Sequence, residues 1–439
     1  MDNGVNGDSA PVASRDVTFS TFAELIGEGG SGASEVVAYE NGSFFVTNGE
    51  NDRIDIFDNP AGTVDGADRT IDLSTLDGYD GVQSVAVKNG VVAAAIARPA
   101  EDTTVFGGTD VALSQAGFVA LFDANTLALL STVDVGNLPD QIAFNADGSK
   151  LLVAGEGEKN EDSEHDDNPL GTVAIVDTTD PANPSVELLD FTAFNGLEEQ
   201  ARAAGIRIQD GVSFAEDVEP EYTAFAFNDD GAFVSLQENN AIAELSIAES
   251  SVVDVFLLGL ADFENGSKLD VNDNGVIEIG QFPSLVGFRM PDAIATYEVD
   301  GETYIVTANE GDSRGFDEAR ISDLVEDGLL DPALAQQFRD AGLIDDDPDS
   351  DIGIERLEVS SIDGDTDGDG DIDVPHTFST RSFSIFDEAG NLVFDSGSDF
   401  EEFIASIAPE RFNDDEGTTD ENRSDAKGPE PEAVTVGQI

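Results

Sequence analysis

Apolar and polar residues alternate in short runs along most of the chain, and this period of two predicts β-strands. One six-residue run recurs, with Asp, Glu or Gln at the second position of every copy. Four of its six copies begin with proline, which suits the first residue of a strand. The copies span 34–39, 82–87, 139–144, 220–225, 291–296 and 431–436.

Three further β-prone runs follow most of these copies, separated by short polar turns such as Lys88-Asn-Gly90. Four antiparallel strands repeated in this way predict an all-β fold, a β-propeller of four-stranded blades. There are five full blades, at 34–74, 83–136, 140–191, 221–258 and 292–396, and a sixth first strand at 432–437. We therefore predict an incomplete propeller over 17–439 and a disordered leader over 1–16. Residues 17–25 are predicted to form an outermost strand that clasps the last blade.

Long insertions interrupt the pattern, and propeller topology places all of them on one face. They span 98–116, 157–170, 192–219, 259–290, 312–380 and 397–431. Amphipathic spacing predicts short helices at 317–327, 332–341 and 399–407, whereas 413–427 is predicted to be a mobile loop. Function on repeat scaffolds usually lies where the insertions are, so this face is the predicted functional face.

The same face is predicted to carry carboxylates at equivalent positions of successive blades, near the propeller axis. Converging carboxylates cannot all stay ionised without a partner, so we expect a cation there, and oxygen ligands suit Ca²⁺. The alternative is that these side chains cap backbone groups between blades and pair with Arg98, Arg289 or Arg314. The predicted ring comprises Glu35, Glu50, Asp140, Glu156, Glu221, Glu238, Asp292, Glu310, Asp312 and Glu432.

A second candidate for Ca²⁺ is an Asp/Gly run that matches the first nine positions of an EF-hand loop, with Gly370 at position six. Position 12 is His376 rather than Glu, so the bidentate ligand must come from elsewhere. In so acidic a chain the run could also be only a solvated turn. The predicted ligands are Asp365, Asp367, Asp369, Asp371 and Asp373, and a weaker loop offers Asp270, Asn272, Asn274 and Glu278.

The charge of the chain is extreme, with 93 acidic residues, 19 basic residues and a formal net charge of -74. This excludes binding to a nucleic-acid backbone or to an anionic membrane, because both require basic patches. A hydrophobic fraction of 40% still permits a buried core, so we expect a folded protein. Only 5 of the basic residues are lysine, which favours a halophilic protein with a hydrated acidic surface. The alternative is an acidic, Ca²⁺-rich surface protein.

Several kinds of chemistry find no support in the sequence. Cysteine is absent, so there are no disulfides and no thiol chemistry. The two histidines form no zinc motif, and the glycine-rich run at 27–32 precedes a strand rather than a helix, so we expect no organic cofactor. No apolar run is long enough for a transmembrane segment, and residues 1–15 lack the apolar core of a signal peptide.

Longer motifs fall in order along the chain: Leu138-Pro-Asp140, Glu219-Pro-Glu-Tyr222, Leu236-Gln-Glu-Asn-Asn-Ala-Ile242, Pro291-Asp-Ala-Ile-Ala295, Val306-Thr-Ala-Asn-Glu-Gly-Asp312, Asp365-Thr-Asp-Gly-Asp-Gly370, Arg381-Ser-Phe-Ser-Ile385 and Lys427-Gly-Pro-Glu-Pro-Glu432. Together they resemble the choice-of-anchor I family, which includes proteins labelled mesenchyme-specific cell surface glycoprotein. The resemblance implies a secreted or surface-tethered propeller of about seven blades, sometimes fused to metallophosphatase modules. Members usually continue past the Pro-Glu-Pro-Glu motif. The resemblance therefore implies that this chain is truncated at its C-terminus, with its leader and anchor outside it.

Two functions follow as expectations. The first is a Ca²⁺-binding propeller outside the cell or on its surface, which acts as a binding, adhesion or scaffold module for an unknown ligand or protein. Its ring would be completed by further blades or by a complementing chain. The alternative is a Ca²⁺-dependent phosphoesterase, since some family members are labelled alkaline phosphatase. Its axial metal centre would use Glu156, Glu221, Asp292, Glu310, Asp312 and Glu432.

Overall fold

The protein is described from a computed structural model. The structure describes residues 23–29, 34–104, 110–159, 168–345, 352–414 and 421–437. The side chains of residues 101–104 and 110–113 are not described. The predicted disordered leader at 1–16 and the acidic segment around His165 lie outside the described residues.

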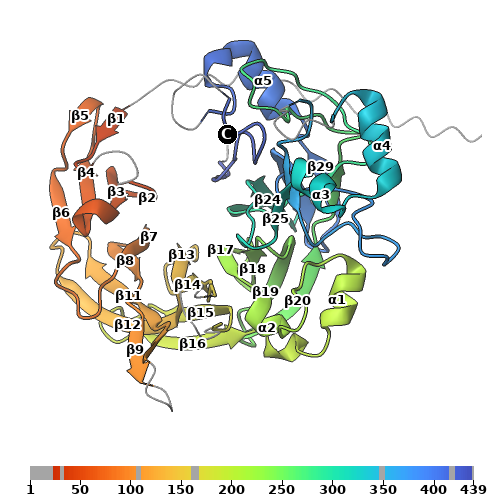
Figure 1. The fold of residues 1–439 in the computed structure, drawn as a ribbon. Coiled ribbons are helices and arrows are strands. Elements are labelled where there is room, and N and C mark those ends of the chain that lie inside the picture. Colours follow the sequence, from red (N-terminus) through yellow and green to blue (C-terminus); the bar gives the residue numbers. More distant parts are fainter. Residues whose placement is uncertain are drawn as a thin grey trace, which may run out of the picture.

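Five four-stranded antiparallel sheets follow one another around a common axis, with the first strand of each sheet innermost (Figure 1). The predicted β-propeller is therefore confirmed. The sheets are β2 (Val37–Glu40), β3 (Ser43–Asn48), β4 (Arg53–Asp58) and β6 (Arg69–Asp72); β7 (Val82–Lys88), β8 (Val91–Ile96), β11 (Ala116–Asp123) and β12 (Leu129–Asn137); β13 (Pro139–Phe144), β14 (Lys150–Gly155), β15 (Thr172–Asp177) and β16 (Ser185–Asp190); β17 (Pro220–Phe225), β18 (Gly231–Leu236), β19 (Ala241–Ser246) and β20 (Ser251–Leu257); and β23 (Ile294–Val299), β24 (Glu302–Asn309), β28 (Ser382–Asp387) and β29 (Leu392–Asp395).

The sheets form an open arc, and two predictions about the ends of this arc are wrong (Figure 1). The predicted sixth first strand at 432–437 is not formed, because no described segment offers its backbone a hydrogen-bonding partner. The predicted clasp at 17–25 is described only from residue 23 onward. There, β1 (Ala23–Ile26) pairs in parallel with β5 (Gly62–Asp65), which is part of the first blade rather than the last.

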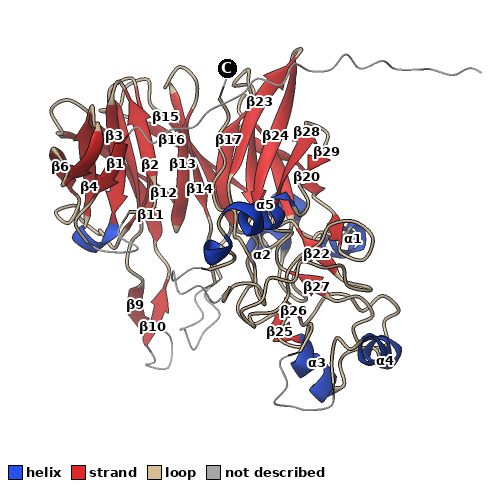
Figure 2. Cartoon of the chain, turned by 90° about the horizontal axis from the view of Figure 1, so that it is seen from above, coloured by secondary structure: helices blue, strands red, loops and turns tan. Residues whose placement is uncertain are grey.

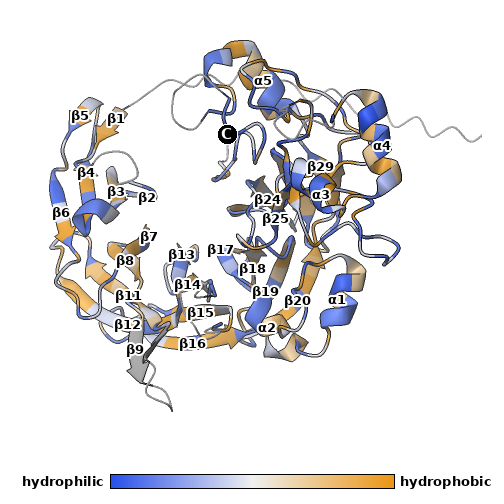
Figure 3. Ribbon diagram, in the orientation of Figure 1, coloured by the Kyte–Doolittle hydropathy of each residue, from blue (hydrophilic) through white to orange (hydrophobic). Residues whose placement is uncertain are grey.

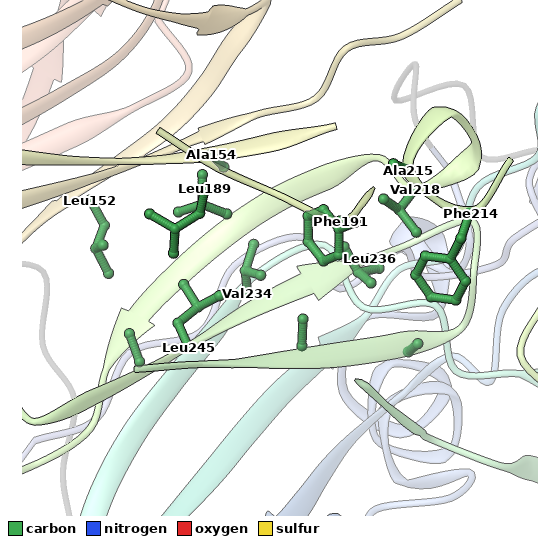
Figure 4. Close-up of a cluster of buried hydrophobic side chains, with 14 of the residues drawn as sticks. Leu152, Ala154, Leu189, Phe191, Phe214, Ala215, Val218, Val234, Leu236 and Leu245 are labelled. Atoms are coloured by element: carbon green, nitrogen blue, oxygen red, sulfur yellow. The ribbon is translucent and has the colours of Figure 1, made fainter. Parts of the chain in front are cut away.

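Neighbouring sheets pack face to face through their apolar side chains. Figure 4 shows Leu152 and Leu189 of the third sheet against Val234 and Leu245 of the fourth, and each of the four is at most 3% exposed. Burying a side chain of this size stabilises the fold by about 1.5–3 kcal/mol. The middle strands β8, β11 and β14 of the second and third sheets are buried on both faces, so they are almost continuously hydrophobic rather than alternating (Figure 3).

The insertions extend on one side of the sheets (Figure 2). The longest has its own apolar core around Phe338 and Leu357, which also takes in Phe263 from the preceding insertion. The predicted helices are present: α4 (Pro332–Ala341) and α5 (Asp399–Ile407) have the predicted bounds, and α3 (Ile321–Asp327) begins four residues later than predicted. None of the described helices is long and apolar enough to cross a membrane. The remaining elements are η1 (Gly49–Asn51), β9 (Glu101–Thr104), β10 (Asp110–Leu113), η2 (Thr192–Phe194), α1 (Glu198–Ala204), α2 (Phe214–Asp217), β21 (Leu260–Asp262), β22 (Val286–Phe288), β25 (Glu318–Arg320), α3 (Ile321–Asp327), α4 (Pro332–Ala341), β26 (Glu358–Ser360), β27 (His376–Thr377), α5 (Asp399–Ile407) and η3 (Pro409–Arg411).

The segment predicted to be a mobile loop at 413–427 is packed wherever it is described. Residues 415–420 lie outside the described residues. Asp425 is 2% exposed and accepts hydrogen bonds from Arg320 Nη1 (2.5 Å) and Arg356 Nη2 (2.9 Å). The prediction was wrong because composition alone cannot show that ion pairs between a buried Asp425 and the arginines of a distant insertion hold this polar segment.

Candidate functional site

A β-bulge recurs near the start of the innermost strand in three blades, and it falls where the repeat carries its acidic residue or Gln. In β17, Pro220 pairs with Leu236 and Thr223 with Val234, so Glu221 and the next residue face a single partner. The strands β7 and β13 shift register at the same place. A bulge inserts one residue and re-aims the side chains beside it. The fold thus repeats a local distortion at the positions of the predicted ring.

Side chains other than the ring carboxylates hold these strand starts in place. Ser235 Oγ accepts a hydrogen bond from the Tyr222 backbone N–H (2.9 Å) and donates one to the Asp292 carbonyl oxygen of the next blade (2.8 Å). Gln141 Oε1 of the third blade likewise accepts a hydrogen bond from the Thr223 backbone N–H of the neighbouring fourth blade (2.9 Å). These groups satisfy the backbone at the start of β17, so the Glu221 carboxylate is not needed as a cap for these two amides.

Six carboxylates of the predicted ring influence one another's ionisation, and we call them the axial cluster: Asp140, Glu156, Glu221, Glu238, Asp292 and Glu310. Burial raises the pKa of Glu156 to about 9, and the charges of Glu238 and Asp140 add to this. Burial also raises the pKa of Asp292 to about 8, with Glu310 adding to the effect. At neutral pH these groups therefore tend to keep a proton or to require a cation.

The arginines named as alternative partners of the ring pair with carboxylates outside the axial cluster: Arg98 with Asp134 (2.7 Å), Arg289 with Asp395 (3.0 Å) and Arg314 with Asp217 (3.1 Å). The charge of Arg314 lowers the pKa of Glu238, but burial is the larger effect and raises it well above its usual value. Lys427 likewise lowers the pKa of Glu310, so the described basic groups oppose the effect of burial only in part.

A cavity of about 460 Å³ opens beside the axial cluster, and we call it the axial cavity. Glu156, Glu221 and Glu238 line it, together with Arg314 from the long insertion. Glu238 is 7% exposed, and no described group forms a hydrogen bond with its buried Oε2. The Arg207 guanidinium holds the strand end here, because its Nη1 donates to the Glu238 carbonyl oxygen (2.9 Å).

The EF-hand-like loop brings three carboxylates together. Asp365, Asp367 and Asp373 each contribute one carboxylate oxygen, and these three oxygens lie within 4.8 Å of one another. The turn depends on glycine, since Gly370 has a φ of +99° in the left-handed region. Asp365 Oδ2 accepts a hydrogen bond from the Gly370 backbone N–H (3.0 Å), which folds the loop around its first ligand position.

A second set in this loop includes a residue that sequence reasoning missed. Carboxylate oxygens of Asp331, Asp371 and Asp373 also lie within 4.8 Å of one another. Asp331 caps α4, with its Oδ1 accepting from the Leu334 backbone N–H (2.7 Å), and its own N–H donates to the Ile372 carbonyl oxygen (3.0 Å). These two sets are the groups of at least three convergent metal-ligating side chains within the described part of the chain.

The family model described as the Choice-of-anchor I domain matches residues 35–439. The chain belongs to the choice-of-anchor I family. The predicted resemblance is thereby confirmed, and no curated protein matches the sequence.

Solved structures share only a distant likeness with this choice-of-anchor I chain. A nidogen/laminin complex has 10% identity and a TM-score of 0.34, covering 63% of this chain and 73% of that one. U3-55K has 11% identity and a TM-score of 0.33, with 64% and 62% covered. The Myceliophteria thermophila Cps50 (Swd1) β-propeller domain has 9% identity and a TM-score of 0.29, with 62% and 78% covered. These values are too low to support a functional comparison.

The other predicted ring residues of this choice-of-anchor I domain lie at the border of the axial cluster or away from it. Glu35 adds to the raised pKa of Asp140, and Glu432 adds to that of Asp292. Asp312 is exposed and accepts a hydrogen bond from Lys427 Nζ (2.8 Å). Glu50 is exposed in η1, and no interaction described for the cluster involves it. Asn48 caps a 3-10 turn that contains Glu50, so Glu50 does not occupy the position that the equivalent residues have in the other blades.

The weaker predicted loop forms a closed turn. The buried Asp270 carboxylate accepts from the backbone N–H groups of Asn272 (3.3 Å) and Glu278, and Asn274 Oδ1 accepts from a further amide of the turn (2.9 Å). Glu421, from the distant C-terminal segment, accepts from that same amide (2.6 Å). These four predicted ligands thus share one turn, and metal binding there stays a prediction.

Glu219 belongs to the site and was missed as a ligand candidate. Burial raises its pKa to about 7, the charge of Arg314 opposes this, and the charge of Glu156 adds to it. Its signal was present in the sequence, because it directly precedes the Pro-Glu start of β17.

Proposed function

We propose that this choice-of-anchor I chain is a Ca²⁺-binding β-propeller displayed on the surface of a halophilic cell, where its insertion-bearing face binds a partner. The observation that carries the proposal is the convergence of Asp365, Asp367 and Asp373. Carboxylate oxygens are the ligands that Ca²⁺ prefers, and alternate acidic residues followed by glycine wrap such an ion.

The Ca²⁺ ion would link two parts of the long insertion. The loop joins the start of α4 through a bridge between Leu330 and Ile372 and through the Asp331 carboxylate. Without a cation, neighbouring carboxylates repel one another, and burial with the charge of Asp369 raises the pKa of Asp371 to about 6. Bound Ca²⁺ would remove this repulsion and hold the insertion in one shape for recognition of a partner.

Other observations support the cellular setting. The name of the family refers to a choice of anchors, which supports display at the cell surface. The net charge of -74 supports an environment of high salt, because salt screens repulsion between surface charges. The insertions extend on one side of the sheets, which provides a varied surface for a ligand or protein (Figure 2).

The test is Ca²⁺ binding and thermal unfolding of the EDTA-dialysed protein in molar KCl. The variant carrying Asp367→Asn and Asp373→Asn should lose one Ca²⁺ per chain and most of the stabilisation that Ca²⁺ gives. A control with Glu50→Gln and Asp65→Asn removes the same charge at exposed positions and should behave like the wild type. Equal Ca²⁺ binding by all three proteins would refute the proposal.

The phosphoesterase alternative retains one favourable observation. The Arg314 side chain is 7% exposed and lines the axial cavity beside the carboxylates, which would suit an anion bound to a metal. A phosphomonoesterase assay of the Ca²⁺-loaded protein tests it. Turnover that Glu310→Gln abolishes without unfolding would favour the enzyme, and no turnover would leave the binding module.

A further inference from the structure

A second cavity, of about 770 Å³, lies where three insertions meet, and we call it the insertion cavity. Its wall combines the end of α1 and the segment after it, the strands β22 and β27, and parts of the long insertion. Figure 2 shows β22 and β27 on the insertion side of the sheets. Ligand pockets usually have volumes of about 300–1,000 Å³, so the insertion cavity is large enough for a small ligand.

Large apolar side chains of the insertion cavity remain exposed to solvent. They are Leu260 (43% exposed), Phe316 (46%) and Ile362 (55%), which come from two different insertions. Single exposed apolar residues are common on protein surfaces, but a group of them around a cavity is typical of a ligand site. The insertion cavity therefore offers an apolar surface that the protein itself does not cover.

The inner wall of the cavity is held in place around the Phe288 ring. The Arg207 guanidinium lies 4.8 Å from the centroid of this ring, and the His376 ring stacks on it with centroids 4.9 Å apart. His376 Nδ1 lies 2.7 Å from the Val374 carbonyl oxygen, which can only accept, so Nδ1 carries the proton. Burial lowers the pKa of His376, which favours the neutral ring at pH 7. Nε2 is then a hydrogen-bond acceptor, and no described group donates to it.

Gln209 adds a second polar group with unused hydrogen-bonding capacity. It is half-buried, and it lies at the border between the insertion cavity and the axial cavity, because it lines both. Its backbone N–H donates to Asp217 Oδ1 (2.9 Å), whereas no hydrogen bond is described for its side-chain amide. That amide can both donate and accept. Together with His376 Nε2, it gives the wall two polar positions for a ligand.

The arginines of the insertion cavity are compensated by carboxylates. The pairs are Arg202 with Asp210 (3.4 Å), Arg207 with Asp317 (2.5 Å) and with Asp363 (2.9 Å), and Arg314 with Asp217 (3.1 Å). The remaining charged residue of the wall, Asp365, belongs to the Ca²⁺ loop. A charged ligand would have to compete with these pairs, and the net charge of -74 would also repel an anion. The wall therefore suits an uncharged ligand.

We propose that the insertion cavity binds a neutral saccharide, whose C–H face packs on Phe316 and Ile362 and whose hydroxyl groups bond to Gln209 and His376 Nε2. A hydroxyl group both donates and accepts, so it can pair with either side chain. An apolar side chain of a peptide would pack on the same surface but would leave both polar groups unpaired. The proposal rests on the proposed function in taking the insertion-bearing face as the binding face.

Saturation-transfer difference NMR in molar KCl tests the site, with methyl β-D-glucopyranoside and methyl α-D-mannopyranoside as probes. The Ca²⁺-loaded wild type should transfer saturation to these neutral glycosides and not to methyl β-D-glucuronoside, which adds a carboxylate to the first probe. Gln209→Ala and Phe316→Ala should each weaken binding at least tenfold. The matched controls Gln336→Ala and Phe227→Ala change exposed side chains outside the cavity and should leave binding unchanged.

Several results would overturn the saccharide site. They are no transfer to either neutral glycoside, equal transfer to the glucuronoside, and unchanged affinity in the folded Gln209→Ala and Phe316→Ala variants. Transfer to N-acetylphenylalaninamide alone would instead make the cavity a peptide site. If circular dichroism shows that one variant does not fold, Ile362→Ala is measured in its place. Neither variant removes a ligand of the Asp365–Asp373 loop, so Ca²⁺ titration of the same proteins shows separately whether the loop proposal holds.

Discussion

Arg381 Nη1 lies 2.6 Å from Glu401 Oε1, and neither side chain is more than 2% exposed. This ion pair joins the start of β28 to helix α5. Arg381 also donates to the carbonyl oxygens of Asp270 (2.5 Å) and Ser424 (2.7 Å), and the Asp270 backbone N–H donates to Glu401 Oε2 (2.9 Å). Two insertions and the C-terminal segment therefore meet at one buried pair.

Breaking this pair should destabilise the protein strongly. Glu401→Ala leaves a buried guanidinium without its counter-charge, which costs about 3–5 kcal/mol of unfolding free energy. The matched control is Glu402→Ala on the same helix, whose ion pair with Lys268 is exposed and contributes at most about 1 kcal/mol. Denaturant unfolding in molar KCl measures both. Equal losses in the two variants would contradict the central role of Arg381.

The stability of the cation-free protein should fall as pH rises. Burial raises the folded-state pKa of Asp140 to about 7, Asp292 to about 8 and Glu156 to about 9, all above their values in the unfolded chain. Groups with raised folded pKa values stabilise the fold below the unfolded pKa and lose that contribution as pH passes the folded value. The melting temperature in EDTA should therefore decrease between about pH 5 and pH 9.

The variant Glu156→Gln should flatten this pH profile, because an amide does not titrate. The exposed Glu50→Gln should not change its slope. Thermal melts at fixed molar KCl check both variants, since the salt screens the general repulsion of the acidic surface. A melting temperature that rises over this range would show that the axial cluster is ionised in the folded state and compensated by other groups.

Addition of Ca²⁺ should raise the melting temperature of the wild type. At a free concentration one hundred times the dissociation constant, one site stabilises the folded state by about 2.7 kcal/mol. The loop variant, which carries Asp367→Asn and Asp373→Asn, should lose most of this gain. Calorimetry at several Ca²⁺ concentrations measures the gain, and an unaffected loop variant would place the binding elsewhere.

Ser235→Ala tests the link between the fourth and fifth blades. It removes the acceptor of the buried Tyr222 N–H and the donor to the Asp292 carbonyl oxygen, at a cost of about 1–3 kcal/mol. The exposed Ser74→Ala should change unfolding free energy by less than about 0.5 kcal/mol. If both substitutions have the same small effect, the hydroxyl is not a link that stabilises the blades.

The sequence predicted the blades and helices because their signals are local. The alternation within each strand and the polar turns between strands fix the five sheets, and apolar spacing fixes α4 at its observed bounds. The loop with Asp365 was predicted for the same reason, since its ligands lie within nine residues of one another. Asp331 was missed because it reaches this loop from a helix cap far along the chain.

The sixth strand failed as a prediction for a different reason. Alternating apolar and polar residues show only that a segment has the pattern of a strand. A strand forms only where another backbone pairs with it. The segment around Asp425 shows the opposite. Its sequence has no periodic pattern, but ion pairs with Arg320 and Arg356 hold it in place. Glu50 shows that an equivalent repeat position need not keep its geometry once a 3-10 turn intervenes.

The long insertion has a hydrophobic core of its own, so we expect it to unfold as a cooperative unit separate from the propeller sheets. Phe338, Leu357 and Phe263 pack within that core, in a cluster separate from those between the propeller sheets. Units of this kind can open and close while the rest of the chain stays native. Native-state hydrogen exchange should therefore show the amides of α3, α4 and β26 exchanging together, through a partial unfolding of lower free energy than that which exposes β14 and β18.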